Sequence, residues 1–218
     1  FRSVIYLNTE ILCQTACGAV DIAMHTIERY FCPGDDTYLT DAIAEAVIKS
    51  TMKASADCLE NPKNYEARAN MMWASSLAHN GLTQCGRQFQ LVVHQLEHEV
   101  SGMYPDVAHG AGLAALWCSW ARYVYSCNIN RWLQFAKNIW NMDIDFEHPE
   151  KTIEQAIDKQ EQYYASIGMP INLKSLGVKK ESLEELALKC SRNRTRTLIG
   201  YKPLEYEDIL KIYQMAYE

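Results

Sequence analysis

Glycine and proline are scarce in this sequence, which has 10 glycines and 6 prolines among 218 residues. A fold with many strands needs such residues at its turns, so their scarcity argues against a β protein. The prolines fall between segments in which apolar residues recur with a helical period. The one run with strand-like alternation is Ser3–Leu7. We therefore predict an all-α protein, a bundle of about seven to eight helices.

The chain also lacks an excess of basic residues and a long apolar run. It has 21 Lys and Arg against 27 Asp and Glu, a net charge of −6, which argues against nucleic acid as a partner. The longest uncharged apolar stretch, Val107–Ala121, is shorter than the ~20 residues that cross a bilayer, so we expect no membrane contact. The 8 cysteines include no C-x-x-C pair. We therefore expect free thiols in a soluble, cytoplasmic protein.

Several catalytic motifs are missing as well. The sequence contains neither a G-x-S-x-G nucleophile motif nor a phosphate-binding P-loop. Gly110-Ala111-Gly112 supplies two glycines of a dinucleotide-binding fingerprint, but the third glycine and the preceding strand are absent. These glycines therefore indicate that the helix that contains them packs closely against a neighbouring helix.

Capping and stop signals predict where helices begin and end. The expected helices are 41–59 with Thr40 as N-cap, 64–80 ending before Gly81, 110–125 buried on nearly every face, 149–167 ending before Gly168, one after a capping box of Ser182 and Glu185, and 206 to the end. A further helical pattern, Gly18–Tyr30, contains the first candidate site residues.

Two histidine groups indicate a metal site. Asp21 and His25 stand four residues apart in a helical pattern, so both project from one face. His94 and His98 repeat that spacing, and His109 follows after a break at a proline. One carboxylate with two or three imidazoles suits Fe(II), Zn, Ni or Co and is poor for Ca or Cu(I). Spacing alone leaves open a second interpretation, an exposed and merely polar helix face.

A rival motif overlaps the second group. The segment His94–His98 spells H-x-x-E-H, which in inverted zinc proteases supplies two ligands and a general-base Glu, here Glu97. Those enzymes place this helix beside a sheet that the sequence does not predict. A metallopeptidase is therefore the weaker alternative.

The ordered motifs resemble one enzyme family. Residues Gln14–Asp21, together with His25 and Glu28–Phe31, are similar to the metal-binding helix of iron-containing alcohol dehydrogenases, particularly the butanol dehydrogenase-like branch. The similarity continues in order through Trp73–Leu77, Asn80–Leu82, His94–Glu99, His109–Ala114, Arg192–Asn193, Ile199–Gly200 and Pro203. This resemblance implies the C-terminal domain of the dehydroquinate synthase-like, iron-containing alcohol dehydrogenase fold.

The resemblance also implies roles for single residues. Asp21, His25, His94 and His109 match the four ligands of the family's catalytic metal, which is Fe2+ first, with Zn2+ or Ni2+ as alternatives. His98 matches a histidine that the family places beside the nicotinamide ring, a catalytic and cofactor-binding position. The implied reaction interconverts a primary alcohol and an aldehyde by hydride transfer with NAD(P)(H), in a homo-oligomer.

One departure from the family concerns the nucleotide. The family has an N-terminal Rossmann-like domain, and nothing in this sequence corresponds to it, while the first residue is Phe1. We therefore expect residues 1–218 to form the helical metal-binding catalytic domain of a larger enzyme. The alternative is a non-catalytic helical metal-binding module, a truncated half-enzyme.

Overall fold

The computed structural model describes the backbone of residues 2–34 and 37–218, and side chains from Ile11 onward within those ranges. This part of the chain is built from helices, and the all-α prediction is confirmed. The α-helices are α1 (Arg2–Tyr30), α2 (Tyr38–Glu60), α3 (Tyr65–His79), α4 (Val92–Met103), α5 (His109–Val124), α6 (Ile129–Asn138), α7 (Pro149–Ser166), α8 (Leu183–Cys190) and α9 (Tyr206–Tyr217). Within the described ranges the only β pairing is an isolated bridge between Leu198 and Leu204. The strand-like run Ser3–Leu7 belongs to α1 and is helical, so that hint was wrong.

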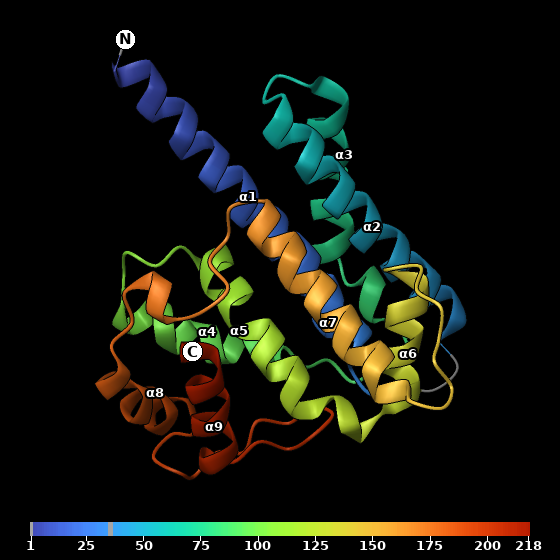
Figure 1. Ribbon diagram of the computed structural model, residues 1–218, viewed down its shortest axis with the longest axis vertical. Helices are drawn as coiled ribbons and strands as arrows, with labels where there is room; N and C mark the ends of the chain where they lie inside the picture. The colour runs from blue at the N-terminus through green and yellow to red at the C-terminus, as the bar shows by residue number, and fades with distance from the viewer. Residues whose placement is uncertain (1, 35–36) are drawn as a thin grey trace.

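The long helix α1 lies at the centre of the helix packing. It contacts α2, α3 and α5, while α5 also contacts α4, α7 and α9 (Figure 1). Further contacts join α2 to α3, α6 to α7, and α8 to both α4 and α9. Helices α1 and α5, which lie far apart in the sequence, therefore pack against each other, and α4 packs against α5. This arrangement positions the site described below.

The helix α5 is the most buried element, as its sequence predicts. Every residue from Gly110 to Ala121 is buried. Its Trp117 joins an aromatic cluster in which Phe31 stacks on Trp132 with ring centroids 4.0 Å apart. Each such ring buries about 150–250 Å² of surface when it is enclosed in a core.

Several predicted helix ends are confirmed. The side chain of Asn64 accepts a hydrogen bond from the backbone N–H of Ala67 and so caps α3. Gly81 and Gly168, which follow α3 and α7, adopt φ of 86° and 77°. Glycine reaches this left-handed region without the steric cost that a Cβ would impose, which explains why the two helices stop there.

Two predicted caps are wrong. Thr40 lies inside α2, whose N-cap is Thr37, and the Thr40 hydroxyl donates to the carbonyl of Cys85. Ser182 has helical backbone angles because a 3-10 turn leads directly into α8, and its side chain makes no capping bond. Among the described residues, a capping box is found at the start of α9 instead. There the Glu205 side chain accepts a hydrogen bond from the backbone N–H of Asp208, and the Asp208 side chain accepts one from the backbone N–H of Glu205.

The described residues contain one helix more than the predicted range. The short α6, which has 10 residues, was not among the expected helices. The side chain of Asn128 caps it by accepting a hydrogen bond from the N–H of Arg131. The Arg131 guanidinium forms an ion pair with the buried Asp41 of α2, with Nη1 to Oδ2 at 2.5 Å. This ion pair therefore joins the short helix α6 to α2.

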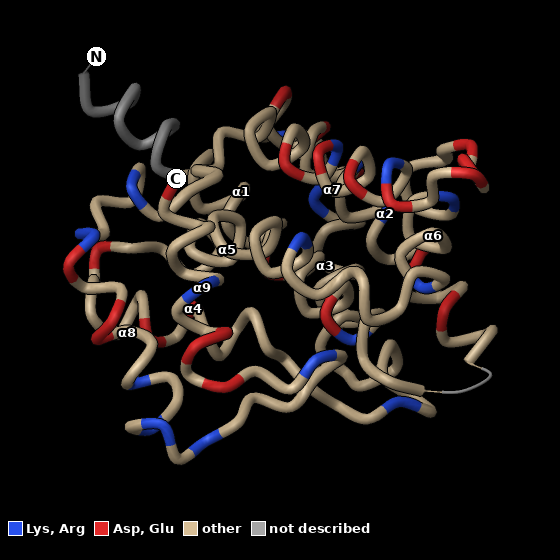
Figure 2. Tube along the Cα trace, turned by 60° about the horizontal axis from the view of Figure 1, so that its bottom comes forward, with Lys and Arg blue, Asp and Glu red and all other residues tan. Residues whose placement is uncertain are grey.

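Charges of both signs are interspersed along the chain (Figure 2). No helix in the described ranges combines the length and the apolar character that a bilayer crossing requires.

The cysteines give a first test of the packing. The described thiols are all free; Cys13, Cys85 and Cys127 are exposed, Cys17 is partly exposed and four are buried. Burial also raises the pKa of Cys190 to about 12, which suppresses its reactive thiolate. We expect a thiol reagent to modify three cysteines rapidly in the native protein and all eight after denaturation. Rapid modification of the four buried thiols under native conditions would contradict the packing.

Candidate metal centre

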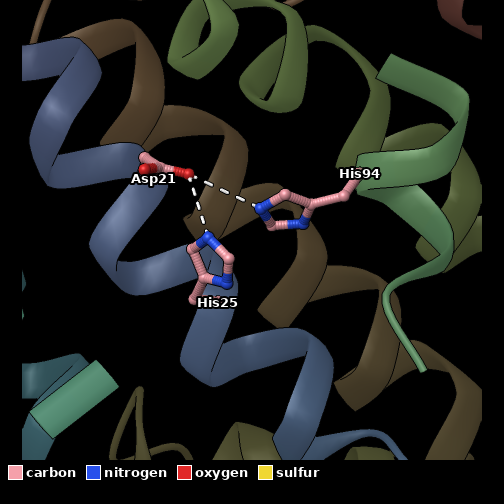
Figure 3. A group of neighbouring side chains, drawn as sticks. All are labelled: Asp21, His25 and His94. Atoms are coloured by element: carbon pink, nitrogen blue, oxygen red, sulfur yellow. Dashed lines mark ion pairs between the residues drawn. The ribbon is translucent and has the colours of Figure 1, made fainter. Parts of the chain in front are cut away.

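Three helices bring four of the predicted site residues to one point. Asp21 and His25 lie one turn apart on α1, His94 lies in the first turn of α4, and His109 is the first residue of α5. The carboxylate oxygen Oδ1 of Asp21 lies 3.5 Å from the Nε2 atoms of His25, His94 and His109. Figure 3 shows the Asp21 carboxylate turned toward the imidazoles of His25 and His94.

The three distances from Oδ1 of Asp21 match those between ligands of a divalent cation, and the ligand atoms of Asp21, His25 and His94 all lie within 4.8 Å of one another. With metal–ligand distances of about 2.1 Å, a tetrahedral site separates its ligand atoms by about 3.4 Å. In addition, Oδ1 of Asp21 and Nε2 of His94 are buried and have no hydrogen-bond partner. Orphaned buried polar atoms cost free energy unless something binds them, so the donor set is suited to a metal.

Glu28 organises the α4 side of the cluster. Its carboxylate accepts hydrogen bonds from the backbone N–H of Val93 at 2.6 Å and of His94 at 3.1 Å. These donors belong to the first turn of α4, which has no intrahelical partners for them, so Glu28 acts as a cap from another helix. It also lies 2.5 Å from Nδ1 of His94 and thereby directs Nε2 toward Asp21. Such carboxylate contacts fix the orientation of metal-binding imidazoles.

Glu97 has the matching role on the α5 side. This residue is fully buried, and its carboxylate contacts Nδ1 of His109, which leaves Nε2 facing Asp21. A protease base would have to face a water molecule in the open cavity. Because Glu97 is bound behind His109 instead, the geometry argues against the metallopeptidase interpretation of H-x-x-E-H.

His98 lies beside the cluster and outside the Asp21 group. Its ring stacks on His109 with centroids 5.4 Å apart and 30° between the planes. It lines the rim of a cavity of about 550 Å³ that also contains Phe89, Leu91 and the four clustered residues. Glu97, His98 and His109 form a second close group of ligand atoms. We prefer the Asp21 group because Glu97 already holds Nδ1 of His109.

Sequence reasoning missed the roles of Glu28 and the position of His79. Glu28 follows Asp21 and His25 at the next helical turn on the same face, a spacing of four and then three residues that could have indicated its role. The His79 ring lies 4.2 Å from that of His25, although α3 enters the site only through tertiary packing.

Burial and neighbouring charges shift the imidazoles in opposite directions. Burial and the charge of His94 lower the pKa of His25 to about 3, so this ring is neutral at pH 7. Burial also opposes protonation of His94, but the adjacent carboxylates of Asp21 and Glu28 outweigh it and raise the pKa of His94 to about 9. Because an imidazole binds a metal only in its neutral form, binding of a cation by His94 would release the proton that these carboxylates favour.

The contacts of Glu28 predict the effect of Glu28→Gln. The amide has one acceptor oxygen where the carboxylate has two, so at least one buried donor loses its partner. We expect unfolding free energy to fall by roughly 1–3 kcal/mol and metal affinity to fall by about 10- to 100-fold. Chemical denaturation and metal titration measure these effects, with the exposed Glu60→Gln as control. Unchanged metal affinity would contradict the positioning role.

The fold and the site define an all-helical domain that gathers one carboxylate and three imidazoles around a common point. A model of the Fe-containing alcohol dehydrogenase family, C-terminal part, matches residues 15–217. The chain therefore belongs to this family, in its butanol dehydrogenase-like branch.

Named relatives agree in sequence and in structure. NADH-dependent butanol dehydrogenase A of Clostridium acetobutylicum is 37% identical over 205 residues, which are 94% of this chain and 52% of that protein. NADPH-dependent aldehyde reductase YqhD of Escherichia coli is 27% identical and is matched over 93% of this chain and 52% of its own length. The crystal structure of NADH-dependent butanol dehydrogenase A from Thermotoga maritima superposes with a TM-score of 0.88 at 32% identity, covering 95% of this chain and 53% of that one. The chain thus spans about half the length of the relatives it matches.

Proposed function

We propose that this chain supplies the metal-bearing part of an enzyme that interconverts a primary alcohol and an aldehyde by hydride transfer with NAD(P)(H). The single observation on which this depends is the Oδ1 atom of Asp21, which lies 3.5 Å from three imidazole nitrogens. The activities for which the relatives are named, butanol dehydrogenase and aldehyde reductase, support this substrate class.

Asp21, His25, His94 and His109 would hold the cation, Fe2+ first, with Zn2+ and Ni2+ as alternatives because all three accept this donor set. When bound, a divalent cation supplies Lewis acidity, which lowers the pKa of an alcohol oxygen and polarises an aldehyde carbonyl. Four protein ligands leave room for a substrate oxygen if the site expands to five-coordination.

The chain's own residues shape the reaction space. Glu28 and Glu97 hold two imidazoles in fixed orientations, so little reorganisation accompanies binding. Phe89 and Leu91 line the cavity beside the cluster and provide apolar contact for a short alkyl chain. We assign His98, at the rim, to contact with the nicotinamide ring.

We propose that the nucleotide is held by a Rossmann-like domain outside these 218 residues. The relatives' length, about twice the matched segment, supports a further domain. Free thiols support a reducing compartment such as the cytoplasm. The homo-oligomer implied by the family resemblance remains a prediction, which size-exclusion chromatography with light scattering can test.

The test of the proposed function is butyraldehyde-dependent oxidation of NADH or NADPH by the Fe2+-loaded protein, expressed from its complete reading frame. We expect turnover, and we expect His94→Ala to lower it by at least about 100-fold, since that ligand would be lost. The His148→Ala variant is the control because this histidine lies at the start of α7, outside the cluster. Metal binding without turnover would favour the non-catalytic module instead.

A further inference from the structure

Three sulfur atoms lie together at a second location on α1. Cys13 and Cys17 stand four residues apart on this helix, so both side chains project from the same face. The Cys17 thiol also donates to the thioether of Met169, with Sγ to Sδ at 3.8 Å. We call these three residues the sulfur cluster. It joins α1 to the segment that follows α7.

The partners of Cys17 distinguish it from the ordinary buried thiols of this fold. Cys32 donates to backbone carbonyls, with Sγ to the oxygen of Glu28 at 3.2 Å, and Cys190 donates to the carbonyl of Gln95 at 3.6 Å. Such hydrogen bonds give the S–H group of a buried thiol a backbone acceptor, as is common in helical proteins. The Cys17 thiol instead donates to the Met169 thioether, so its side-chain partner is itself a soft sulfur donor.

The third sulfur is held in place by its own backbone. Met169 follows Gly168, whose φ of 77° turns the chain out of α7, and its N–H donates to the carbonyl of Tyr164 at 2.9 Å. Met169 is 6% exposed, so its thioether is fixed against Cys17 and is not a freely moving surface group.

The cluster is open to solvent on one side. Cys13 is exposed, and both Cys13 and Met169 line a cavity of about 720 Å³ that is distinct from the cavity of the histidine cluster. A small ion can therefore reach the sulfur atoms without opening the fold. The carboxylate of Asp106 lines the same cavity and favours a cation within it.

We propose that Cys13, Cys17 and Met169 form a binding site for a soft, thiophilic cation, with Cu(I) as its preferred occupant. Thiolate and thioether ligands select Cu(I) over the harder ions that suit a carboxylate and imidazoles. With metal–sulfur distances of about 2.3 Å, a trigonal site separates its sulfur atoms by about 4.0 Å. The 3.8 Å between Cys17 and Met169 is close to that value.

Binding at this site exchanges protons and transfers no electron. Each cysteine ligates as a thiolate, so up to two thiol protons pass to solvent as two copper–sulfur bonds form, while Met169 adds its neutral lone pair. Burial and the neighbouring Cys13 raise the pKa of Cys17 to about 11. Cu(I) affinity is therefore expected to increase as the pH rises from 6 to 8.

The test is an anaerobic titration of the full chain with Cu(I), buffered by a competing chelator, after the histidine cluster has been loaded with Zn2+. X-ray absorption then counts the sulfur neighbours of copper. We expect one Cu(I) per chain with three sulfur neighbours, an affinity loss of at least about tenfold in Cys17→Ser and in Cys13→Ser, and two sulfur neighbours in Met169→Leu.

Two controls separate this site from other thiols and from the histidine cluster. Cys127→Ser removes an exposed thiol elsewhere and is expected to leave Cu(I) affinity unchanged. His94→Ala disrupts the histidine cluster and is expected to leave the sulfur-bound copper in place. The proposal is overturned if copper has only nitrogen and oxygen neighbours, or if Cys17→Ser and Cys13→Ser, shown by circular dichroism to be folded, bind Cu(I) as tightly as the native chain.

Discussion

Replacing Asp21 with Ala is expected to reduce divalent-metal affinity by at least about 100-fold, more than the loss of an outer-shell partner causes. Asp21 supplies the one negative charge of the cluster, and its Oδ1 atom is the point from which all three imidazole nitrogens lie 3.5 Å away. Without it, three neutral ligands remain around a buried cation. Metal content after dialysis, measured by elemental analysis, gives the result.

The matched control is Asp57→Ala. Asp57 also lies on a helix and also pairs with a basic residue four positions away, Lys53, at 2.8 Å, but on the surface of α2. Its replacement is expected to leave metal content unchanged. His109→Ala should resemble Asp21→Ala because it removes a ligand from a different helix. Full metal occupancy in both variants would refute the proposed site.

Gly110→Ala is expected to destabilise the fold by about 3 kcal/mol or more, because α1 and α5 touch backbone to backbone at this residue. A Cβ at position 110 would lie 2.2 Å from the carbonyl oxygen of Cys17 and 2.7 Å from its carbonyl carbon. No side-chain rotation relieves a clash with backbone, so the two helices must separate. Denaturant unfolding followed by circular dichroism measures the loss.

The same variant is expected to weaken metal binding. Gly110 immediately follows His109, and Cys17 lies one turn before Asp21, so the close approach of α1 and α5 sets the distance between two proposed ligands. The control is Gly102→Ala, also in a helix, where a Cβ meets nothing within 4 Å. There we expect a gain of about 0.5–1 kcal/mol from helix propensity. Equal stability of the two variants would contradict the packing argument.

Much of the fold could be predicted because its determinants are local. Asn64 caps its own helix, and Gly81 and Gly168 end theirs through backbone angles that other residues adopt only at a cost. The failures were also informative. Ser182 has the right side chain for a cap, but a preceding 3-10 turn gives it helical angles, and that turn is set by packing rather than by the four-residue motif.

The candidate site was predictable for a different reason. Asp21 and His25 share a face because of helix geometry alone, but nothing local joins them to His94 or His109, which lie about 70 and 90 residues further along the chain. Only the family resemblance connected the four. The structure then brought them together, and it placed His98 at the edge, outside the Asp21 group.

By itself the sequence determined the helical class, most helix ends and the types of residue available for chemistry, since these depend on periodicity and on contacts within a few residues. Only the tertiary structure decided what the buried carboxylates do. Glu28 and Glu97 are ordinary helix residues until packing brings each one against an imidazole from another part of the chain. Packing also brings Met169, which follows α7, against Cys17 of α1. Distances across a core depend on how closely helices approach, and the glycine at position 110 sets that approach through a contact that no sequence spacing encodes.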